Sequence, residues 1–438
     1  MDTRPHIVIL GGGFGGLFAA RALDRAPVRV TLIDRHNYHL FQPLLYQVAT
    51  ASLSPADVAS PIRWVLRRQK NVEVLLAGAR AIDPVRRHVV LDPENVIPFD
   101  YLLLATGAAH SYFGHDDWER RAPGLKTLDD ALKMRQQILL AFEAAERAGS
   151  VDDQRRLLTF VIVGGGPTGV ELAGALAEIA RQSLRNDFRR IRPESAHIVL
   201  LEGSPHLLGA FPEPLRDAAR HSLERLGVEV RTDAQVVGVD AEGVLWRAAS
   251  AEPSNAPRRI AAETILWAAG VAASPLARSI GVPVDRAGRI AAEPTLAVPG
   301  HPTIFVAGDI CAFAENGKPL PGVAQVAMQQ GAHAARNIVR AIRQQALESF
   351  HYRDYGIMAT IGRGSAVGDI FGLRITGYFA WLFWIFLHIF WLIGFRNRIA
   401  VMLEWAWAYI TFQRRVRLIT AEHAWQRSTD VPPDRRPD

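Results

Sequence analysis

The hydrophobic positions of the chain fall into short continuous runs, which are separated by glycine-rich turns and by polar segments of helical character. The runs 6–10 and 28–34 enclose a helix-like segment at 17–26, and a second series has runs at 160–163 and 197–202. Continuous apolar runs bounded by turns are typical of strands buried on both faces of a parallel sheet. The pattern predicts an α/β fold with two copies of one strand–turn–helix–strand unit.

Each unit has a glycine-rich turn directly after its first strand. In the first unit Gly11, Gly13 and Gly16 give the spacing Gly-x-Gly-x-x-Gly, and the next strand ends in Asp34. In this arrangement the first glycine permits a tight turn, the second lets the backbone approach a pyrophosphate, and the third packs the helix against the strand. The acid at the strand end can accept hydrogen bonds from the hydroxyls of a ribose. The first unit therefore predicts a dinucleotide site.

The second unit repeats this arrangement with Gly164, Gly166 and Gly169, and its next strand ends in Glu202. One such glycine pattern arises easily by chance in a loop. Two patterns, each with the expected strand, helix and terminal acid, are much more specific. The weaker alternative is a pair of glycine turns that bind no ligand.

Two dinucleotide sites in one chain predict FAD in the first site and a nicotinamide cofactor in the second. A late apolar run, 303–313, ends near Gly308 and Asp309, where a carboxylate can bind a ribityl hydroxyl. We expect two Rossmann-like domains of the two-dinucleotide flavoprotein type and a C-terminal amphipathic, membrane-anchoring region. The expected divisions are an FAD domain at 1–120 and 286–345, an NADH domain at 121–285, a membrane-docking region at 346–420 and a disordered tail at 421–438.

The residues after Glu202 bear on the choice of nicotinamide cofactor. They are Gly203, Ser204 and Pro205, with no arginine or lysine among them. A carboxylate binds a free 2′-hydroxyl and repels a 2′-phosphate, so NADH is expected over NADPH. The alternative is that Glu202 is a surface acid at the end of a strand.

Cysteine content and charge exclude several classes of function. Cys311 is the single cysteine, so the chain has neither an intrachain disulfide nor a redox-active cysteine pair, and disulfide reductases are excluded. No metal site is expected. The net charge of +6 favours anionic partners. The basic segment 181–195 is more typical of a solvated surface, so we expect no nucleic-acid partner.

Several longer motifs make the chain resemble the type II NADH:quinone oxidoreductases, or alternative NADH dehydrogenases. The motifs are HNYHLFQPLLYQVAT (36–50), GGGPTGVELAG (164–174), FVAGDICAF (305–313), AQVAMQQG (324–331) and YGIMATIGRGSAV (355–367). The resemblance implies an enzyme of the respiratory chain with non-covalent FAD. Such an enzyme oxidises NADH and reduces a membrane quinone without pumping protons.

The resemblance also implies roles for particular residues. Glu171 matches a glutamate near the contact between flavin and nicotinamide, where it could orient the nicotinamide or help to deliver a proton. The alternative is that Glu171 is an acid in the first turn of a helix, where acids are favoured in any case. Gln325 matches a glutamine on the quinone side of the flavin. Both are candidate catalytic residues.

The remaining candidates are cofactor contacts. For FAD they are Gly11, Gly12, Gly13, Phe14, Gly15, Gly16, Asp34, Arg35, Gln42, Pro43, Leu44, Ala79, Thr106, Gly107, Gly308, Asp309, Ala324 and Gln325. For NADH they are Gly164, Gly166, Gly169, Glu171, Glu202 and Gly270.

The C-terminal segment 377–395 is strongly apolar and close to the length that spans a bilayer. On a helix, Trp381, Trp384, His388 and Trp391 fall on one stripe, which we expect to face lipid headgroups. The other sides, with Phe383, Phe386, Ile389, Phe390 and Ile393, are expected to face acyl chains. Basic residues follow this segment and the next apolar one: Arg396, Arg398, Arg414, Arg415 and Arg417.

This pattern predicts an enzyme that lies on the inner membrane as a peripheral, monotopic protein. A core-type strand at 6–10 leaves no room for a cleavable signal peptide, so the cytoplasmic side is expected. The alternatives are a spanning helix and a segment buried in a core or in a dimer interface. The oligomeric state stays open, a homodimer included.

Two other functions remain open from the sequence. One is a flavoprotein NADH reductase of a soluble electron acceptor, which accounts for both glycine turns but not for residues 377–417. The other is a non-enzymatic flavin- and NADH-binding protein that uses its C-terminal helices as a partner interface.

Overall fold

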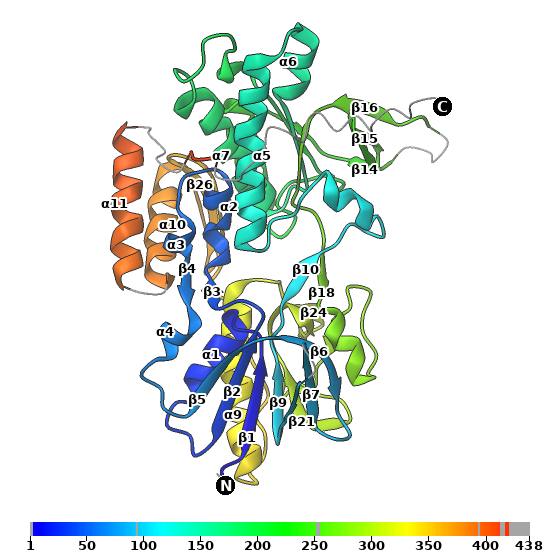
Figure 1. Cartoon of the computed structure of the whole chain (residues 1–438), viewed down its shortest axis with the longest axis vertical. Coiled ribbons are helices and arrows are strands. Elements are labelled where there is room, and N and C mark those ends of the chain that lie inside the picture. The colour runs from blue at the N-terminus through cyan, green and yellow to red at the C-terminus, as the bar shows by residue number, and fades with distance from the viewer. Residues whose placement is uncertain (1–2, 93–94, 251–254, 393–394, 412–416, 420–438) are drawn as a thin grey trace, which may run out of the picture.

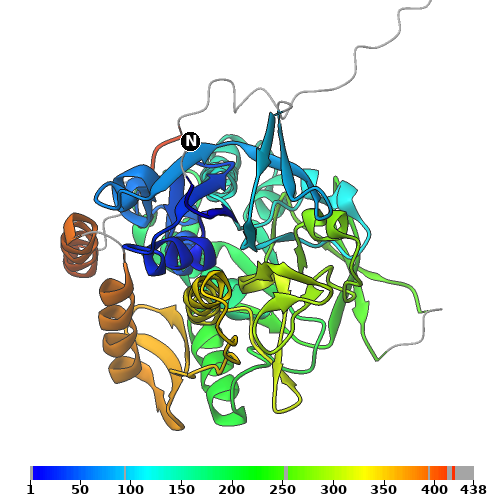
Figure 2. The same cartoon turned by 90° about the horizontal axis from the view of Figure 1, so that it is seen from below.

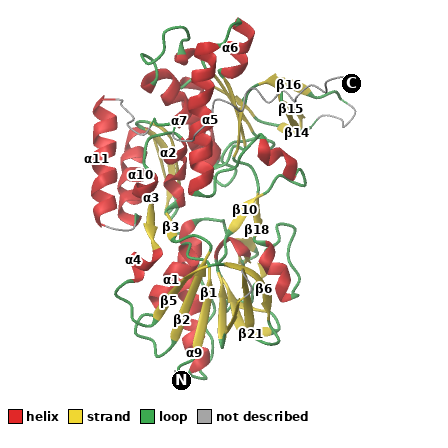
Figure 3. Ribbon diagram, viewed as in Figure 1, coloured by secondary structure: helices red, strands yellow, loops and turns green. Residues whose placement is uncertain are grey.

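A computed structural model of the chain places two α/β units one above the other, with two helices standing beside them (Figure 1). It describes all residues except 1–2, 93–94, 251–254, 393–394, 412–416 and 420–438. The expected tail at 421–438 and the basic residues Arg414 and Arg415 therefore lie outside the described residues. Coloured by secondary structure, each unit shows strands flanked by helices (Figure 3).

The lower unit is built on a six-stranded sheet with the order β20-β21-β9-β1-β2-β5. Its pairings are parallel except for that between β20 and β21. Helices α1 (Phe14–Ala22) and α9 (Ala324–Ile342) pack together in this unit. The strands are β1 (His6–Leu10), β2 (Arg29–Asp34), β5 (Val72–Leu76), β9 (Tyr101–Leu104), β20 (Ala297–Val298) and β21 (His301–Val306), and an antiparallel sheet adds β6 (Gly78–Asp83), β7 (His88–Asp92) and β8 (Asn95–Pro98).

The upper unit repeats this design with a parallel sheet of order β13-β12-β11-β17. Its strands are β11 (Thr159–Val163), β12 (His197–Leu201), β13 (Val228–Arg231) and β17 (Thr264–Trp267), and its antiparallel sheet has β14 (Ala234–Asp240), β15 (Gly243–Ala248) and β16 (Arg258–Ala261). The helices are α5 (Leu128–Arg147), α6 (Val151–Leu157), α7 (Pro167–Glu178) and α8 (Glu213–Arg225). The prediction of an α/β fold with two copies of one unit is confirmed.

The chain crosses between the units on two adjacent strands. β10 (Ala108–His110) pairs antiparallel with β18 (Val271–Ala273). The 3-10 helix Pro275–Ile280 then packs into the core of the lower unit. We therefore propose domain boundaries near residues 110 and 273, in place of the expected 120 and 285.

Shorter elements complete the lower unit and its junction with the C-terminal part. They are β3 (Tyr38–Leu40), α2 (Leu45–Ala49), α3 (Pro55–Val58), β4 (Ala59–Pro61), α4 (Ile62–Leu66), β19 (Ile290–Ala291), β22 (Cys311–Ala312), β23 (Ala314–Glu315) and β24 (Lys318–Pro319). α2 packs against both α5 and α7, so it connects the two units.

The C-terminal part adds a three-stranded antiparallel sheet, which the hydrophobic pattern did not predict. Its strands are β25 (Ile357–Gly362), β26 (Ser365–Ile370) and β27 (Leu373–Thr376). Helix α10 (Gly377–Trp391) packs on this sheet, and α11 (Phe395–Thr411) packs on α10 and α3. Seen from below, both helices stand at one edge of the molecule (Figure 2). Of the helices that the structure describes, none has the length and hydropathy needed to cross a membrane.

The expectation that the Trp and His stripe of α10 faces headgroups is wrong. Trp381 and Trp384 are buried in the protein core, and His388 stacks on Trp384 with ring centroids 4.1 Å apart. The stripe faces inward because α2 and α11 offer polar and aromatic partners there. Trp391, at 37% exposure, is the one member at the surface, and the exposed face consists mainly of large apolar side chains, among them Phe379 and Phe386.

Two of the basic residues of this part, Arg398 and Arg417, have internal partners. The Nε of Arg398 donates to the carbonyl of Leu392 at 2.8 Å. Arg417 forms an ion pair with Asp187 and donates to the carbonyl of Ser183 at 2.9 Å. Arg417 therefore ties the C-terminal end to the upper unit instead of standing free to meet anionic lipid.

Candidate active site

A cleft of 1140 Å³ runs between the two units and reaches helix α10. One end is lined by Gly11 and Asp34, at the carboxyl ends of β1 and β2. Its middle passes Glu171 of α7, and its far end is lined by His388 and Phe390 of α10. Ligands of open parallel sheets bind at this edge, where the strand order reverses. The cleft therefore joins the first glycine turn to helix α10.

The first glycine turn leaves the N-terminus of α1 without a side-chain cap, so its free N–H groups favour a phosphate. The Oδ2 of Asp34 accepts from the N–H of Gly12 at 2.5 Å, and its Oδ1 accepts from His36 at 2.7 Å. A carboxylate has about four acceptor positions. Asp34 is thus held by the backbone and keeps acceptor positions for ribose hydroxyls.

Most of the predicted FAD contacts line this one cleft. They are Gly11, Gly13, Phe14, Gly15, Asp34, Arg35, Gln42, Pro43, Ala79, Thr106, Gly107, Gly308, Asp309, Ala324 and Gln325. Gly12, Gly16 and Leu44 do not line it. Leu44 is fully buried, and a Cβ on Gly16 would lie 1.8 Å from the carbonyl oxygen of Gly11, so Gly16 serves helix–strand packing.

The second glycine turn has the same internal geometry. The Oε2 of Glu202 accepts from the N–H of Gly165 at 2.6 Å, and its Oε1 accepts from the N–H of Ser204 at 2.7 Å. The N-terminus of α7 also lacks a side-chain cap. The turn is therefore ready for a phosphate, with an acid held where a ribose would lie.

Only one of the six predicted NADH contacts lines the large cleft, and this is Glu171. Thr168, which the sequence analysis did not single out, lines it as well. The others, Gly164, Gly166, Gly169, Glu202 and Gly270, lie outside its lining. The second turn thus meets the cleft through the first residues of α7.

Glu171 is the fifth residue of α7, beyond the first turn in which an acid would stabilise the helix terminus. Its Oε1 accepts one long hydrogen bond, from the N–H of Thr360 at 3.5 Å. Burial raises the pKa of this carboxyl well above its ordinary value, which favours the protonated form of Glu171. The position favours a part in the chemistry over helix capping.

Gln325 is the second residue of α9 and also lines the cleft. Its Nε2 donates to the carbonyl of Gly356 at 2.7 Å, while its buried Oε1 has no hydrogen-bond partner among the described residues. A buried amide oxygen without a partner is costly, so a ligand that donates a hydrogen bond would fit here. Gln330 instead accepts from the N–H of Gly308 at 2.8 Å, which is a structural role.

The sequence analysis missed Lys126, whose amine lies in the cleft wall near Asp309. Burial lowers the pKa of Lys126. The sequence does carry a signal for the loop: Thr127 and Asp130 form a capping box at the start of α5, and the backbone N–H of Lys126 donates to Asp130 at 3.1 Å.

The role of α10 in the cleft was also missed. Phe383, Phe386, Leu387, His388, Phe390 and Trp391 all line the far end. The Nδ1 of His388 donates to the carbonyl of Trp384 at 2.7 Å. Burial lowers the pKa of His388 to about 4, so its ring is neutral. The cleft ends in a mainly apolar wall.

Comparison with known proteins identifies the family. A family profile described as pyridine nucleotide-disulphide oxidoreductase matches residues 5–331. The chain is 45% identical to the type II NADH:quinone oxidoreductase NdhA of Mycobacterium tuberculosis (strain ATCC 25618 / H37Rv), over 97% of this chain and 91% of that protein. It is 42% identical to Ndh of the same organism, over 97% and 92% of the two chains. The chain belongs to the type II NADH:quinone oxidoreductases.

The fold agrees with this family. The structure of NDH2 from Plasmodium falciparum in complex with NADH superposes with a TM-score of 0.85 at 22% identity, over 93% of this chain and 98% of that one. A type II NADH:quinone oxidoreductase is an enzyme, so the chain is an oxidoreductase. Its lone Cys311 is buried, and burial raises the pKa of the thiol to about 12, so this cysteine takes no part as a thiolate.

Proposed function

We propose that the protein transfers two electrons from NADH, through a non-covalently bound FAD, to a quinone dissolved in the membrane. The observation that carries this proposal is the single cleft lined by the first glycine turn, by Thr168 and Glu171 of α7, and by the apolar residues of α10. Donor and acceptor sites can thus meet at one cofactor.

The residues of the cleft fit FAD. Gly13 lines it, and a Cβ added there would meet no protein atom within 4 Å, so the backbone is open to a phosphate. The buried Oγ1 of Thr106 and Oε1 of Gln325 have no partner among the described residues and both belong to cleft-lining residues. Asp34 would hold the adenosine ribose and Asp309 a ribityl hydroxyl. When bound, FAD accepts a hydride from NADH and passes two electrons on to the quinone.

The residues of the chain would then bind and orient NADH and the quinone and supply a proton. The N-terminus of α7 would hold the NADH pyrophosphate, and Glu202 would bind the ribose and reject a 2′-phosphate. Gln325 would donate or accept a hydrogen bond at the quinone end. Glu171, protonated in the cleft wall, would supply a proton.

The exposed apolar face of α10 and α11 supports docking on a membrane. Its large side chains include Phe379 at 79% exposure and Leu403 at 65%, and it adjoins the apolar end of the cleft. A patch of this kind marks an interaction surface. We place the enzyme on the cytoplasmic face of the inner membrane, where quinone could enter from the lipid and NADH from the cytoplasm. The family resemblance implies that turnover pumps no protons.

The test is NADH oxidation by the purified, detergent-solubilised protein with and without a short-chain quinone. We expect FAD to be released on denaturation and NADH oxidation to depend on quinone. In sealed vesicles, turnover should move no charge across the membrane and so generate no membrane potential. Flavin that NADH bleaches but quinone does not reoxidise would point instead to another acceptor, and a protein that binds no flavin would overturn the proposal.

A further inference from the structure

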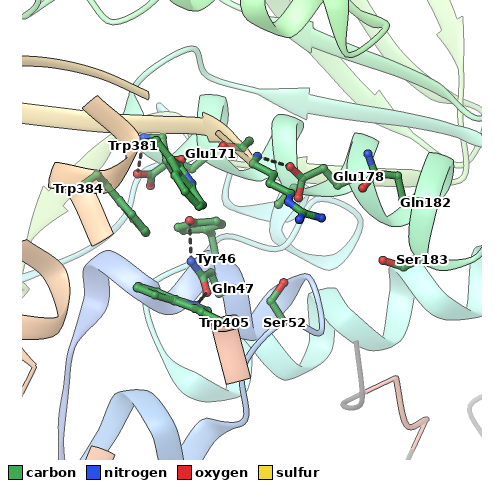
Figure 4. A pocket seen from close by; sticks show the side chains of 14 residues that line it. Tyr46, Gln47, Ser52, Glu171, Glu178, Gln182, Ser183, Trp381, Trp384 and Trp405 are labelled. Atoms are coloured by element: carbon green, nitrogen blue, oxygen red, sulfur yellow. Dashed lines mark hydrogen bonds between the residues drawn. The ribbon is translucent and has the colours of Figure 1, made fainter. Parts of the chain in front are cut away.

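A second, smaller pocket of about 80 Å³ lies behind the large cleft and shares Tyr46 and Glu171 with it. Figure 4 shows Glu171, Glu178 and Gln182 along one side, Tyr46, Gln47 and Trp405 across from them, and Trp381 and Trp384 at the end next to Glu171. Its volume is enough for several water molecules, and its wall is polar where Glu171 and Glu178 contribute to it. Glu171 therefore stands between the reaction cleft and a separate polar cavity.

One face of α7 and of the turn that continues it lines this pocket. Glu171, Ala175, Glu178 and Gln182 follow one another at intervals of four, three and four residues, so they share a helix face. Glu171 and Glu178 are both half-buried and Gln182 is exposed. The small side chain of Ala175 keeps the space between the two acids open. The pocket thus leads from the surface to Glu171.

The opposite wall closes the pocket with aromatic residues and a fixed hydrogen-bond chain. The Nε1 of Trp405 donates to the Oε1 of Gln47 at 2.8 Å, and the Nε2 of Gln47 donates to the hydroxyl of Tyr46 at 2.9 Å. The buried Nε1 of Trp384 has no partner among the described residues. A water molecule in the pocket would satisfy it. Tyr46, Glu178 and Arg363 are the titratable or charged groups that share the lining with Glu171.

The reaction needs a proton from water. Oxidation of NADH by a quinone yields NAD⁺ and a quinol: NADH supplies two electrons and one proton, and the second proton comes from solvent. The α10 residues that line the cleft, where we place the quinone, form a mainly apolar wall. We propose that the small pocket is the route by which this second proton reaches Glu171, with Glu178 as the acid at its outer end. This inference rests on the proposed function.

The geometry sets how the route works. Seven residues along a helix span about 10 Å, too far for direct transfer between Glu171 and Glu178, so water must bridge the two acids. Glu171 gives its proton to the cleft, and the carboxylate left behind takes a proton from this water. Glu178 then passes a proton to this water and takes a new proton from solvent. One proton enters for each NADH oxidised, which balances the reaction.

Glu178 also has a structural contact, because its Oε1 accepts from the backbone N–H of Arg363 at the β25–β26 turn. The test variant is therefore Glu178→Gln, whose amide oxygen can keep this contact. Glu146→Gln is the matched control: Glu146 likewise accepts from backbone N–H groups, at 3.0 Å from Arg189 and Arg190, but lines neither pocket.

We expect Glu178→Gln to lower quinone-dependent turnover about tenfold, with the loss growing as the pH rises and solvent protons become scarce. The solvent deuterium isotope effect should increase, and a small weak acid such as imidazole should restore part of the rate. NADH should bleach the flavin of the variant as fast as that of the wild type.

The proposal is overturned if the variant matches wild type in turnover, pH profile and isotope effect. It is equally overturned if turnover falls while the isotope effect stays as in wild type and imidazole restores none of the rate. That outcome would be a purely structural loss. Absence of quinone-dependent turnover in the wild-type protein would instead count against the proposed function, so the two failures are distinguishable.

Discussion

At the residue scale, the buried carboxyl of Glu171 links catalysis to stability. Its pKa is raised by burial, so the folded protein holds this proton more tightly than the unfolded chain does. This contribution to stability is present in full at low pH and is lost as the pH rises towards the folded-state pKa. The Tm of Glu171→Gln minus the Tm of the wild type should therefore increase by about 2 °C or more between pH 5 and pH 8. A Tm difference that does not change with pH would contradict the burial of the carboxyl.

The same substitution should slow the reaction without releasing the flavin. Glu171 lies in the cleft wall and makes one long hydrogen bond among the described residues, so its replacement removes a proton source and little binding. We expect turnover with quinone to fall at least tenfold while the flavin absorbance per protein stays unchanged. Loss of flavin from the variant would show that Glu171 holds the cofactor.

Glu202 should set the choice between NADH and NADPH. Glu202→Gln removes the charge that repels a 2′-phosphate but can still accept from the N–H of Gly165. The ratio of kcat/KM for NADH over that for NADPH should fall about tenfold, equivalent to about 1.4 kcal/mol. Steady-state kinetics with both cofactors measure this ratio. The control is Glu224→Gln, at an exposed acid on α8, which should leave the ratio unchanged.

At the scale of elements, the contact between α7 and β25 positions Glu171 against Thr360. Gly174 allows it, because a Cβ there would lie 1.6 Å from the carbonyl oxygen of Ile361. Gly174→Ala must push the two elements apart, so we expect a loss of about 1–3 kcal/mol in the free energy of unfolding together with slower turnover. In Gly149→Ala the added Cβ meets no atom within 4 Å, so this exposed control should be neutral or slightly stabilising. Denaturant unfolding of both variants separates these outcomes.

The sequence predicted the positions of those elements that are determined by local pattern. The strands of both parallel sheets, the two glycine turns and the acids Asp34 and Glu202 could be predicted, because continuous apolar runs and glycine spacing are local signals. The orientation of α10 could not. Its aromatic stripe at Trp381 and Trp384 suits a headgroup layer as well as a core, and only α2 and α11, distant in sequence, decide that it faces inward.

At the scale of the whole molecule, the exposed faces of α10 and α11 should control access to quinone in lipid. Phe379→Asp combined with Leu403→Asp places charges on this surface but changes no cleft-lining residue. We expect binding to phospholipid vesicles to fall, and oxidation of NADH by a long-chain quinone in those vesicles to fall with it. Activity with a short-chain, water-soluble quinone should persist.

The control for this pair is Val85→Asp, at an exposed position in the turn between β6 and β7. It should bind vesicles as wild type does. If the double variant changed the oligomeric state but not vesicle binding, the apolar face would be an interface between copies of the chain.

The assembly of the cleft could not be predicted from local sequence. Lys126, Thr168 and the α10 residues come from different elements, and they meet only because β10 and β18 bring the two units together. The family resemblance could assign roles to residues at motif positions. It could not assign these cleft-lining residues, because they come together through contacts between segments far apart in the chain.

The strand order of the lower sheet has a consequence for how the protein is made. β9 pairs with β1 on one side and with β21 on the other, although β21 is separated from β9 by the whole upper unit. During synthesis the upper unit, with strands from β11 to β17, emerges complete while the lower sheet still lacks β21 and the helix α9 that packs on α1. Domains generally fold as units when their segments are available. The second nucleotide-binding unit should therefore fold first on the ribosome, and the unit that begins the chain should be the last of the two to close.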